Sequence, residues 1–266
     1  MKIAVLGTGN MGRAIIDGLL RKYENTVTIT AYDLRPAALH NLDKRVDVAE
    51  PQQWVQMDAI IVSVKPSDIF DALLALKPLF EKSDFNPLVI SIAAGISIGT
   101  IQQQFSSVVR VCRVMPNTPA MIGEGMSACA LAQNCNENDH TLCKNIFGAC
   151  GKVFVVPENL INGVTGLSGS GPAYVYFFIE ALAEGGVAAG LSHDAAMKSA
   201  VQTVIGAARM VEATKEDPSV LISKVMSPGG TTERGMAVLE QKGFKEIVRS
   251  AVDAAVRRAQ ELSARG

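Results

Sequence analysis

The sequence has almost no net charge and no long uninterrupted apolar run. Its 25 lysines and arginines stand against 26 aspartates and glutamates, which leaves a formal charge of −1. Without an excess of positive charge, neither a polyphosphate backbone nor an anionic membrane would be held, so we expect no nucleic-acid partner and no membrane partner. Glu180 and Glu184 interrupt the most apolar region, well short of the roughly 18 residues that a membrane span needs. We therefore expect a cytoplasmic protein.

Paired cysteines are also lacking. The five cysteines form an odd set without a C-x-x-C pair, and of the three histidines only His140 lies near them. Zinc sites and disulfide frameworks both depend on paired ligands at characteristic spacings. We expect no metal site, and reduced cysteines that fill the core. The apolar start at Met1–Leu6 runs into Gly7 and Gly9 without a basic leader, so we interpret it as a strand and not as a signal peptide.

The first part of the chain alternates β-branched runs with helical segments. Between the first two runs lies Met11–Lys22, whose apolar residues recur on one helix face. This alternation predicts a mostly parallel sheet between helices, that is, an α/β Rossmann-like domain over residues 1–160. The predicted strands cover residues 2–6, 27–32, 59–64, 88–92, 109–114, 127–132 and 152–156.

From about Val164 onward the pattern changes to long helical periods without a convincing strand. We predict an all-α domain over residues 161–266. About 100 residues of mostly apolar helix make a marginal core alone, so we expect this domain to pair with a second copy and form a homodimer. A monomeric bundle is the alternative. The predicted helices cover residues 172–189, 193–214, 219–225 and 232–265, the last of them from Thr232 to Arg265.

A glycine-rich loop joins the first predicted strand to the first predicted helix. Its pattern is G-x-G-x-x-G, in which the glycines allow a tight turn, close approach of a pyrophosphate, and close packing of the helix on the strand. Amide groups at the start of that helix suit phosphates. We predict that a dinucleotide binds at Gly7, Thr8, Gly9, Asn10, Met11 and Gly12.

The residues after the second predicted strand leave the choice of dinucleotide open. Asp33 could accept a hydrogen bond from a ribose 2′-hydroxyl, which favours NAD. Arg35 could instead bind the 2′-phosphate of NADP. Both residues are therefore predicted to contact the cofactor.

Two further strand ends are predicted to line the cofactor site, because ligands of open α/β sheets bind beyond the carboxyl ends of the strands. The alternative is that Lys65 only ends a strand in solvent and that Ala94 and Gly95 only form a tight turn. The predicted lining residues are Val64, Lys65, Pro66, Ala93, Ala94 and Gly95.

A second candidate site begins a late helix. Gly229 and Gly230, followed by Thr231 and Thr232, offer several free amide groups in a concave arrangement that suits a carboxylate. An ordinary helix cap with a Gly-Gly turn is the alternative.

The earlier segment Gly166–Pro172 contains serines, but neither Ser168 nor Ser170 has the flanking glycines of a G-x-S-x-G elbow. Hydroxyacid dehydrogenases of similar layout carry a lysine where this chain has Val175. A ketone needs a proton donor for the alkoxide, whereas a protonated cyclic imine already carries its proton. The missing lysine favours reduction of a C=N bond.

Together these segments resemble pyrroline-5-carboxylate reductases over essentially the whole chain. The matching pieces are Gly7–Gly12, Val64–Pro66, Ala93–Gly95, Arg113–Pro119, Ser168–Tyr174 and Ser227–Thr232.

The resemblance implies reduction of 1-pyrroline-5-carboxylate to L-proline, the last step of proline biosynthesis. NADPH is the donor it implies, and NADH is possible because Asp33 is not the small or basic residue associated with NADPH-preferring members. It also implies dimers formed by the helical domains, which can assemble further into decamers. A related imine or hydroxyacid reductase and a non-catalytic nucleotide sensor are the alternative functions.

The resemblance assigns the substrate carboxylate to Gly229, Gly230, Thr231 and Thr232, with Thr232 Oγ1 directed at the imine nitrogen as the catalytic group. To the substrate-binding set we add Met115, Asn117 and Ser170, which lie in the matching segments.

Overall fold

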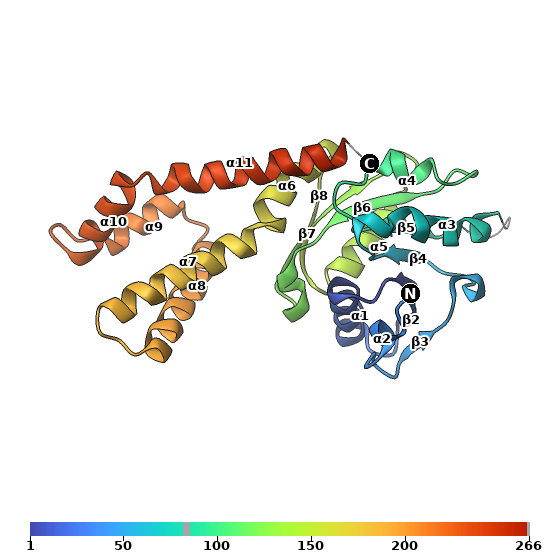
Figure 1. The fold of residues 1–266 in the computed structure, drawn as a ribbon, viewed down its shortest axis with the longest axis horizontal. Coiled ribbons are helices and arrows are strands. Elements are labelled where there is room, and N and C mark those ends of the chain that lie inside the picture. The colour runs from blue at the N-terminus through green and yellow to red at the C-terminus, as the bar shows by residue number, and fades with distance from the viewer. Residues whose placement is uncertain (82–85, 265–266) are drawn as a thin grey trace. The chain divides into compact units, whose positions relative to one another are not determined.

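The computed structural model describes residues 1–81 and 86–264, and within these ranges the chain forms an eight-stranded sheet (Figure 1). The strand order is β3-β2-β1-β4-β5-β6-β7-β8, and every pair is parallel except β6 with β7. The strands are β1 (Lys2–Leu6), β2 (Thr28–Tyr32), β3 (Val46–Val48), β4 (Ala59–Val62), β5 (Leu88–Ser91), β6 (Val111–Met115), β7 (Gly125–Leu131) and β8 (Gly151–Val155).

Helices cover both faces of this sheet, because alternate side chains of each buried strand point to opposite sides. On one face Ile3 and Val5 pack with apolar residues of α1 and α5, and on the other Ala4 and Leu6 pack with those of α3. The predicted α/β Rossmann-like fold is confirmed. The helices of this part are α1 (Asn10–Tyr23), α2 (Pro36–Leu39), α3 (Ile69–Phe80), α4 (Ile98–Gln102), α5 (Glu137–Phe147) and α6 (Ile161–Val164).

All seven predicted strands occur, with ends shifted by a few residues, but the sequence analysis missed β3. This strand has three residues, Val46, Asp47 and Val48, and lies at the edge of the sheet, where β2 is its only partner among the described strands. So short a strand has too few alternating residues to give a periodic signal.

The cysteines fill the core as predicted. All five are free, four are buried, and Cys135 is half-buried. Burial raises the pKa of the Cys150 thiol to about 11, so this thiol stays protonated and unreactive near neutral pH.

By compactness the chain divides into two units, which are described separately. The first comprises Met1–Ser170 and Ala254–Gly266, and the second comprises Gly171–Asp253. This division groups residues 161–170 and the end of the chain with the sheet, whereas the predicted domains divide at residues 160 and 161. The predicted boundary stays a prediction.

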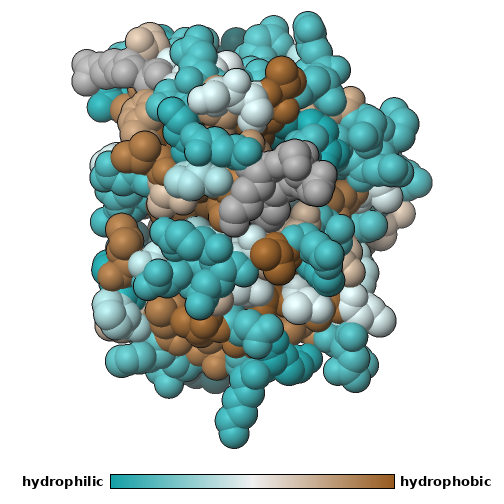
Figure 2. Space-filling view, turned by 90° about the vertical axis from the view of Figure 1, so that its right-hand side faces the viewer, coloured by the Kyte–Doolittle hydropathy of each residue, from teal (hydrophilic) through white to brown (hydrophobic). Residues whose placement is uncertain are grey.

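The face drawn in Figure 2 is mostly hydrophilic, with scattered apolar side chains.

The second unit is helical. It contains α7 (Gly171–Ala188), α8 (His193–Thr214), α9 (Pro218–Val225), α10 (Thr231–Gln241) and the first half of α11 (Phe244–Ser263). The single helix predicted from Thr232 to Arg265 is wrong, because Gly243 has a φ of 66° and separates α10 from α11. Glycine adopts this left-handed conformation at little cost and commonly ends a helix. Arg265 lies outside the described residues.

The second unit buries little apolar surface of its own. Its buried cluster consists of Ala183, Ala196 and Ala200, while large side chains such as Phe177 remain 73% exposed. Among the described residues, no helix combines the length and the apolar character that crossing a membrane requires.

Candidate cofactor and substrate sites

Gly7, in the loop between β1 and α1, and Gly12, in the first turn of α1, are both required by the fold. Gly7 has a φ of 95°, and a Cβ there would lie 2.5 Å from the backbone oxygen of Ser63. A Cβ on Gly12 would lie 2.2 Å from the backbone oxygen of Gly7. Both positions therefore exclude any side chain, and the loop turns tightly against the end of β4.

Gly9 differs from these two glycines because it faces open space. Its φ is −67°, and a Cβ there would meet nothing within 4 Å. Gly9 is the N-cap of α1, and no side chain caps this helix. The first amide groups of a helix have no partner within it, and the helix dipole favours an anion at this end. The loop thus offers a bare backbone surface at the point where a pyrophosphate was predicted.

Asp33, at the end of β2, is bound from two directions. Its residue surface is only 8% exposed. Oδ2 accepts a hydrogen bond from the Thr8 amide at 2.8 Å, and Oδ1 accepts from the Arg35 amide at 3.0 Å and its Nε at 3.2 Å. Burial alone would raise the pKa of Asp33, but the hydrogen bonds from Arg35 and Thr8 outweigh it, so this pKa lies below its ordinary value. The ionised carboxylate of Asp33 therefore links the end of β2 to the glycine loop through hydrogen bonds.

Arg13 and Ala38 were missed by the sequence analysis. The Arg13 guanidinium donates to the Ala38 oxygen at 2.9 Å, and Thr8 Oγ1 donates to the same oxygen at 2.8 Å. These contacts hold the segment after β2 against the glycine loop. The one available signal was an arginine on the first turn of the predicted helix, which does not by itself identify a partner. Arg35 has a side chain that is 69% exposed, so its guanidinium is accessible to a ligand while paired with Asp33.

Three predicted cofactor segments follow neighbouring strands at the same edge of the sheet. In the parallel register Leu6 of β1 pairs with Val62 of β4, and Val62 pairs with Ser91 of β5. The glycine loop, Val64–Pro66 and Ala93–Gly95 therefore begin side by side. Lys65 and Pro66 are exposed, Val64 and Ala94 are half-buried, and Ala93 and Gly95 are buried.

Met115 and Asn117 contact the segment that ends the first unit. Asn117 Nδ2 donates to the Ser168 oxygen at 3.0 Å, and its Oδ1 accepts from the Met126 amide at 2.8 Å. A Cβ on Gly169 would lie 2.7 Å from Met115 Cε. Asn117 thus already has protein partners for both ends of its amide. Ser170 is half-buried, and its amide donates to the Thr165 oxygen at 2.9 Å.

In the second unit, the predicted carboxylate site lies at the start of α10. Gly230 is the N-cap of this helix, no side chain caps it, and Gly229 has a φ of 71°. The Gly229 amide donates to Oε2 of Glu233 at 2.7 Å. A carboxylate from the chain itself is therefore bound at this turn. The Thr232 residue is half-buried and Thr231 is exposed.

Within residues 1–81 and 86–264, no group of three histidine, cysteine, aspartate or glutamate side chains could hold a metal ion. The candidate sites offer backbone amides, hydroxyl groups and the Asp33–Arg35 ion pair.

A doubly wound sheet with a glycine loop between β1 and α1, joined to a helical unit, defines a two-part dinucleotide-binding protein of the dehydrogenase type. Residues 2–95 match the family model described as NADP oxidoreductase, coenzyme F420-dependent. Residues 158–262 match the model described as pyrroline-5-carboxylate reductase dimerisation. The chain belongs to the pyrroline-5-carboxylate reductase family.

Relatives match over nearly the full length. Pyrroline-5-carboxylate reductase of Synechocystis sp. is 41% identical over 98% of this chain and 98% of the relative. The enzyme of that name from Arabidopsis thaliana is 40% identical over 98% of this chain and 95% of the relative. The crystal structure of Plasmodium falciparum pyrroline carboxylate reductase with NADP bound is 31% identical, covers 99% of this chain and 98% of that chain, and has a TM-score of 0.86.

Proposed function

We propose that the protein reduces 1-pyrroline-5-carboxylate to L-proline with NADPH, the last step of proline biosynthesis. The observation that carries the proposal is the open backbone face at Gly9, next to two further strand ends, in a chain that is 41% identical to a pyrroline-5-carboxylate reductase over nearly its whole length. The protein is thus an oxidoreductase that acts on a C=N bond.

The strand order supports one direction for the cofactor across the edge of the sheet. In doubly wound folds the residue after β2 contacts the adenosine ribose and the glycine loop contacts the pyrophosphate. The nicotinamide half then extends over the ends of β4 and β5, where Val64–Pro66 and Ala93–Gly95 are its proposed walls. When bound, this cofactor supplies the hydride that the imine carbon receives.

Arg35 supports NADPH as the donor. A guanidinium suits a 2′-phosphate, and the Arg35 guanidinium is largely exposed and oriented by Asp33. The carboxylate of Asp33 already accepts hydrogen bonds from Thr8 and Arg35, so most of its capacity for a ribose hydroxyl is occupied. We propose that NADH is used less well. The bound NADP in the Plasmodium falciparum relative agrees with this preference.

The turn Gly229–Thr232 is the proposed site for the substrate carboxylate. The bond from the Gly229 amide to Glu233 supports it, because the amides of this turn accommodate a carboxylate. The substrate carboxylate would either replace the Glu233 carboxylate at the Gly229 amide or bind the amides of the residues that follow in this turn. Thr232 Oγ1 would then hydrogen-bond the imine nitrogen and orient the C=N bond. We include Met115, Asn117 and Ser170 among the residues around the substrate.

No proton donor is needed from the protein for this reaction. A protonated imine carries its proton on nitrogen, and after hydride addition to carbon that nitrogen is an amine. Val175, where hydroxyacid dehydrogenases carry a lysine, has no titratable group. The site would act mainly by holding the two reactants in the correct orientation.

The helical unit supports a homodimer. Three buried alanines make a small core, and large apolar side chains stay exposed on the separate unit. The matched family model is one for dimerisation, and pairing would bury these side chains. Assembly of the dimers into decamers and a cytoplasmic location, without nucleic-acid or membrane partners, complete the proposal.

The decisive experiment is a spectrophotometric assay of purified protein with pyrroline-5-carboxylate, run separately with NADPH and with NADH. We expect turnover with both donors and a higher kcat/KM with NADPH. Oxidation of the donor with a keto acid and not with the cyclic imine would instead identify a hydroxyacid reductase. Tight cofactor binding without turnover on any C=N substrate would identify a nucleotide sensor.

A further inference from the structure

The end of the last helix packs directly on the loop that follows β5. Gly95, in that loop, is buried and has a φ of 81°. A Cβ on Gly95 would lie 3.1 Å from Cβ of Leu262 and 3.3 Å from its carbonyl carbon. Only a glycine permits so close an approach without displacement of α11. Both residues belong to the first unit.

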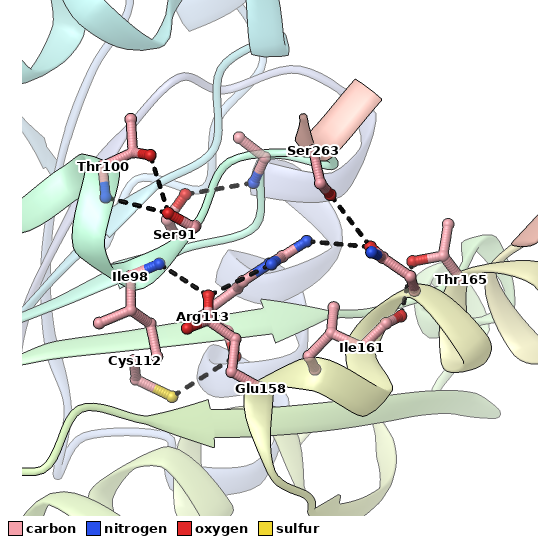
Figure 3. Close-up of polar contacts among 12 residues, drawn as sticks. Ser91, Ile98, Thr100, Cys112, Arg113, Glu158, Ile161, Thr165 and Ser263 are labelled. Atoms are coloured by element: carbon pink, nitrogen blue, oxygen red, sulfur yellow. Dashed lines mark hydrogen bonds and ion pairs between the residues drawn. The ribbon is translucent and has the colours of Figure 1, made fainter. Parts of the chain in front are cut away.

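An ion pair between the buried Arg113 and the half-buried Glu158 holds the far end of the same loop. Oε1 of Glu158 accepts hydrogen bonds from the Ile98 amide at 2.7 Å and from Nη1 of Arg113 at 3.2 Å (Figure 3). Arg113 lies on β6, beside Ser91 of β5, and is only 4% exposed. Because a buried charge without a partner is costly, Arg113 keeps Glu158 in place, and Glu158 in turn holds the start of α4.

The last helix joins this ion pair through a shared acceptor. Asn162 Oδ1 accepts a hydrogen bond from Ser263 Oγ at 3.1 Å and another from Nη2 of Arg113 at 3.5 Å. We call Arg113, Glu158, Asn162 and Ser263 the Arg113 brace. It connects β6, the segment before α6, α6 itself, the start of α4 and the end of α11.

The loop from Ala93 to Ile98 is therefore fixed at three points. At its start the Ala93 amide donates to Ser91 Oγ at 3.3 Å, and at its end the Ile98 amide donates to Glu158. Between them Leu262 lies behind Gly95. Two of these three contacts depend on residues more than 50 positions away in the sequence, so the loop alone does not determine its own conformation.

We propose that the C-terminal turn of α11 is a positioning element of the nicotinamide half of the cofactor site. Leu262 supports Gly95 from behind, and Ser263 ties the turn to the Arg113 brace. The proposal rests on the proposed function, in which Ala93–Gly95 is a wall on the nicotinamide side. Helix α11 is continuous from Phe244 to Ser263, so it begins in the unit that carries Gly229–Thr232 and ends in the unit that carries this wall.

The test compares two ligands that differ in the nicotinamide. Calorimetric titrations would use NADPH and 2′-phosphoadenosine diphosphoribose, which lacks that ring, with wild type, Leu262→Ala and Ser263→Ala. For Leu262→Ala we expect the dissociation constant of NADPH to rise about five- to tenfold, or about 1 to 1.4 kcal/mol. For Ser263→Ala, which removes one neutral hydrogen bond, we expect a rise of about two- to threefold. The truncated ligand should bind all three proteins equally.

Glu261→Ala is the matched control on the same turn. Glu261 is exposed and pairs with Arg258. Removal of its side chain should change neither the affinity for NADPH nor the affinity for 2′-phosphoadenosine diphosphoribose. Leu262 is itself 40% exposed, and a melting curve for each variant would verify that it is folded.

Unchanged NADPH affinity in both Leu262→Ala and Ser263→Ala would overturn the proposal. So would an equal loss of affinity for the two ligands, because general loosening of the fold would explain it. Wild type that binds NADPH but does not reduce pyrroline-5-carboxylate would overturn the proposed function alone. Wild type that binds neither ligand would overturn both.

Discussion

The backbone amide of Thr8 donates a hydrogen bond to Oδ2 of Asp33 over 2.8 Å, which ties the glycine loop to the end of β2. The acidic residue at this place in a dinucleotide-binding fold is usually a ligand of the ribose. Here the carboxylate instead holds the loop and orients Arg35. We therefore expect the contribution of Asp33 to cofactor binding to be mainly indirect.

Asp33 should make stability depend on pH in the acid range. Its folded pKa lies below the ordinary value of 3.8, so the carboxylate stabilises the fold above that value, and this contribution is lost as pH falls through the folded pKa. Asp33→Asn should lower the melting temperature most near neutral pH, and the difference from wild type should narrow below about pH 4. Melting curves over this range would check it, with Asp17→Asn on the exposed side of α1 as control. A difference that stays constant with pH would contradict it.

Arg35→Ala should weaken the binding of NADPH and leave the binding of NADH almost unchanged. Loss of a charged hydrogen bond to the 2′-phosphate should raise KM for NADPH about ten- to hundredfold while KM for NADH changes little. Steady-state kinetics with both donors would measure the two effects. The chain offers a matched control in Arg45→Ala, because Arg45 pairs with Asp43 at the same sequence spacing but lies outside the candidate site. An equal change for both donors would exclude a contact with the phosphate.

Gly9→Ala and Gly12→Ala should separate cofactor binding from folding. A methyl group on Gly9 enters open space, so the melting temperature should stay close to wild type while NADPH binding weakens at least about tenfold, as close approach of the pyrophosphate is blocked. A methyl group on Gly12 meets the Gly7 oxygen and should destabilise the fold by about 1 to 3 kcal/mol. Thermal melts and ligand titrations together distinguish the outcomes. If Gly9→Ala kept the full affinity for NADPH, the pyrophosphate would not bind at this loop.

Thr232→Ala should lower kcat by about one to two decades, which corresponds to a hydrogen bond worth about 1.4 to 2.7 kcal/mol in the transition state. Thr232→Ser keeps the hydroxyl and should retain most of the activity. Both variants would be assayed with saturating NADPH and pyrroline-5-carboxylate. Wild-type kinetics in Thr232→Ala would remove this hydroxyl from the mechanism.

Phe177→Glu should weaken self-association. Phe177 is 73% exposed on α7, and a charge there would have to be buried when two helical units pair. Sedimentation velocity should detect a smaller species than wild type. Val108→Glu, at a position that is 80% exposed in the first unit, should leave the assembly unchanged. An unchanged sedimentation coefficient for Phe177→Glu would place the dimer contact elsewhere.

Much of the fold could be predicted because its signals are local. The alternation of apolar runs and helical periods predicted seven strands of the sheet, and the spacing of Gly7, Gly9 and Gly12 predicted the loop between β1 and α1. The errors also have local causes. Strand β3 is too short to show a period, and the residues around Gly243 are compatible with either a continuous helix or a break.

The hydrogen-bond partners of the candidate site residues could not be predicted from the sequence as well as the fold could. From the sequence Asp33 could serve a ribose, whereas in the fold it binds the Thr8 amide, and Asn117 has protein partners on both ends of its amide. Such pairings depend on the approach of segments that are distant in the sequence. The roles of the individual site residues remain predictions that the variants above would test.

Sequence alone determined the class of fold, the glycine loop and the family resemblance, because periodicity and motif spacing are properties of neighbouring residues. Tertiary structure decided that Leu262 lies against Gly95 and that Arg113, Glu158, Asn162 and Ser263 share hydrogen bonds. Some of these contacts join residues that are more than a hundred positions apart in the sequence, and only packing of the whole first unit brings them together.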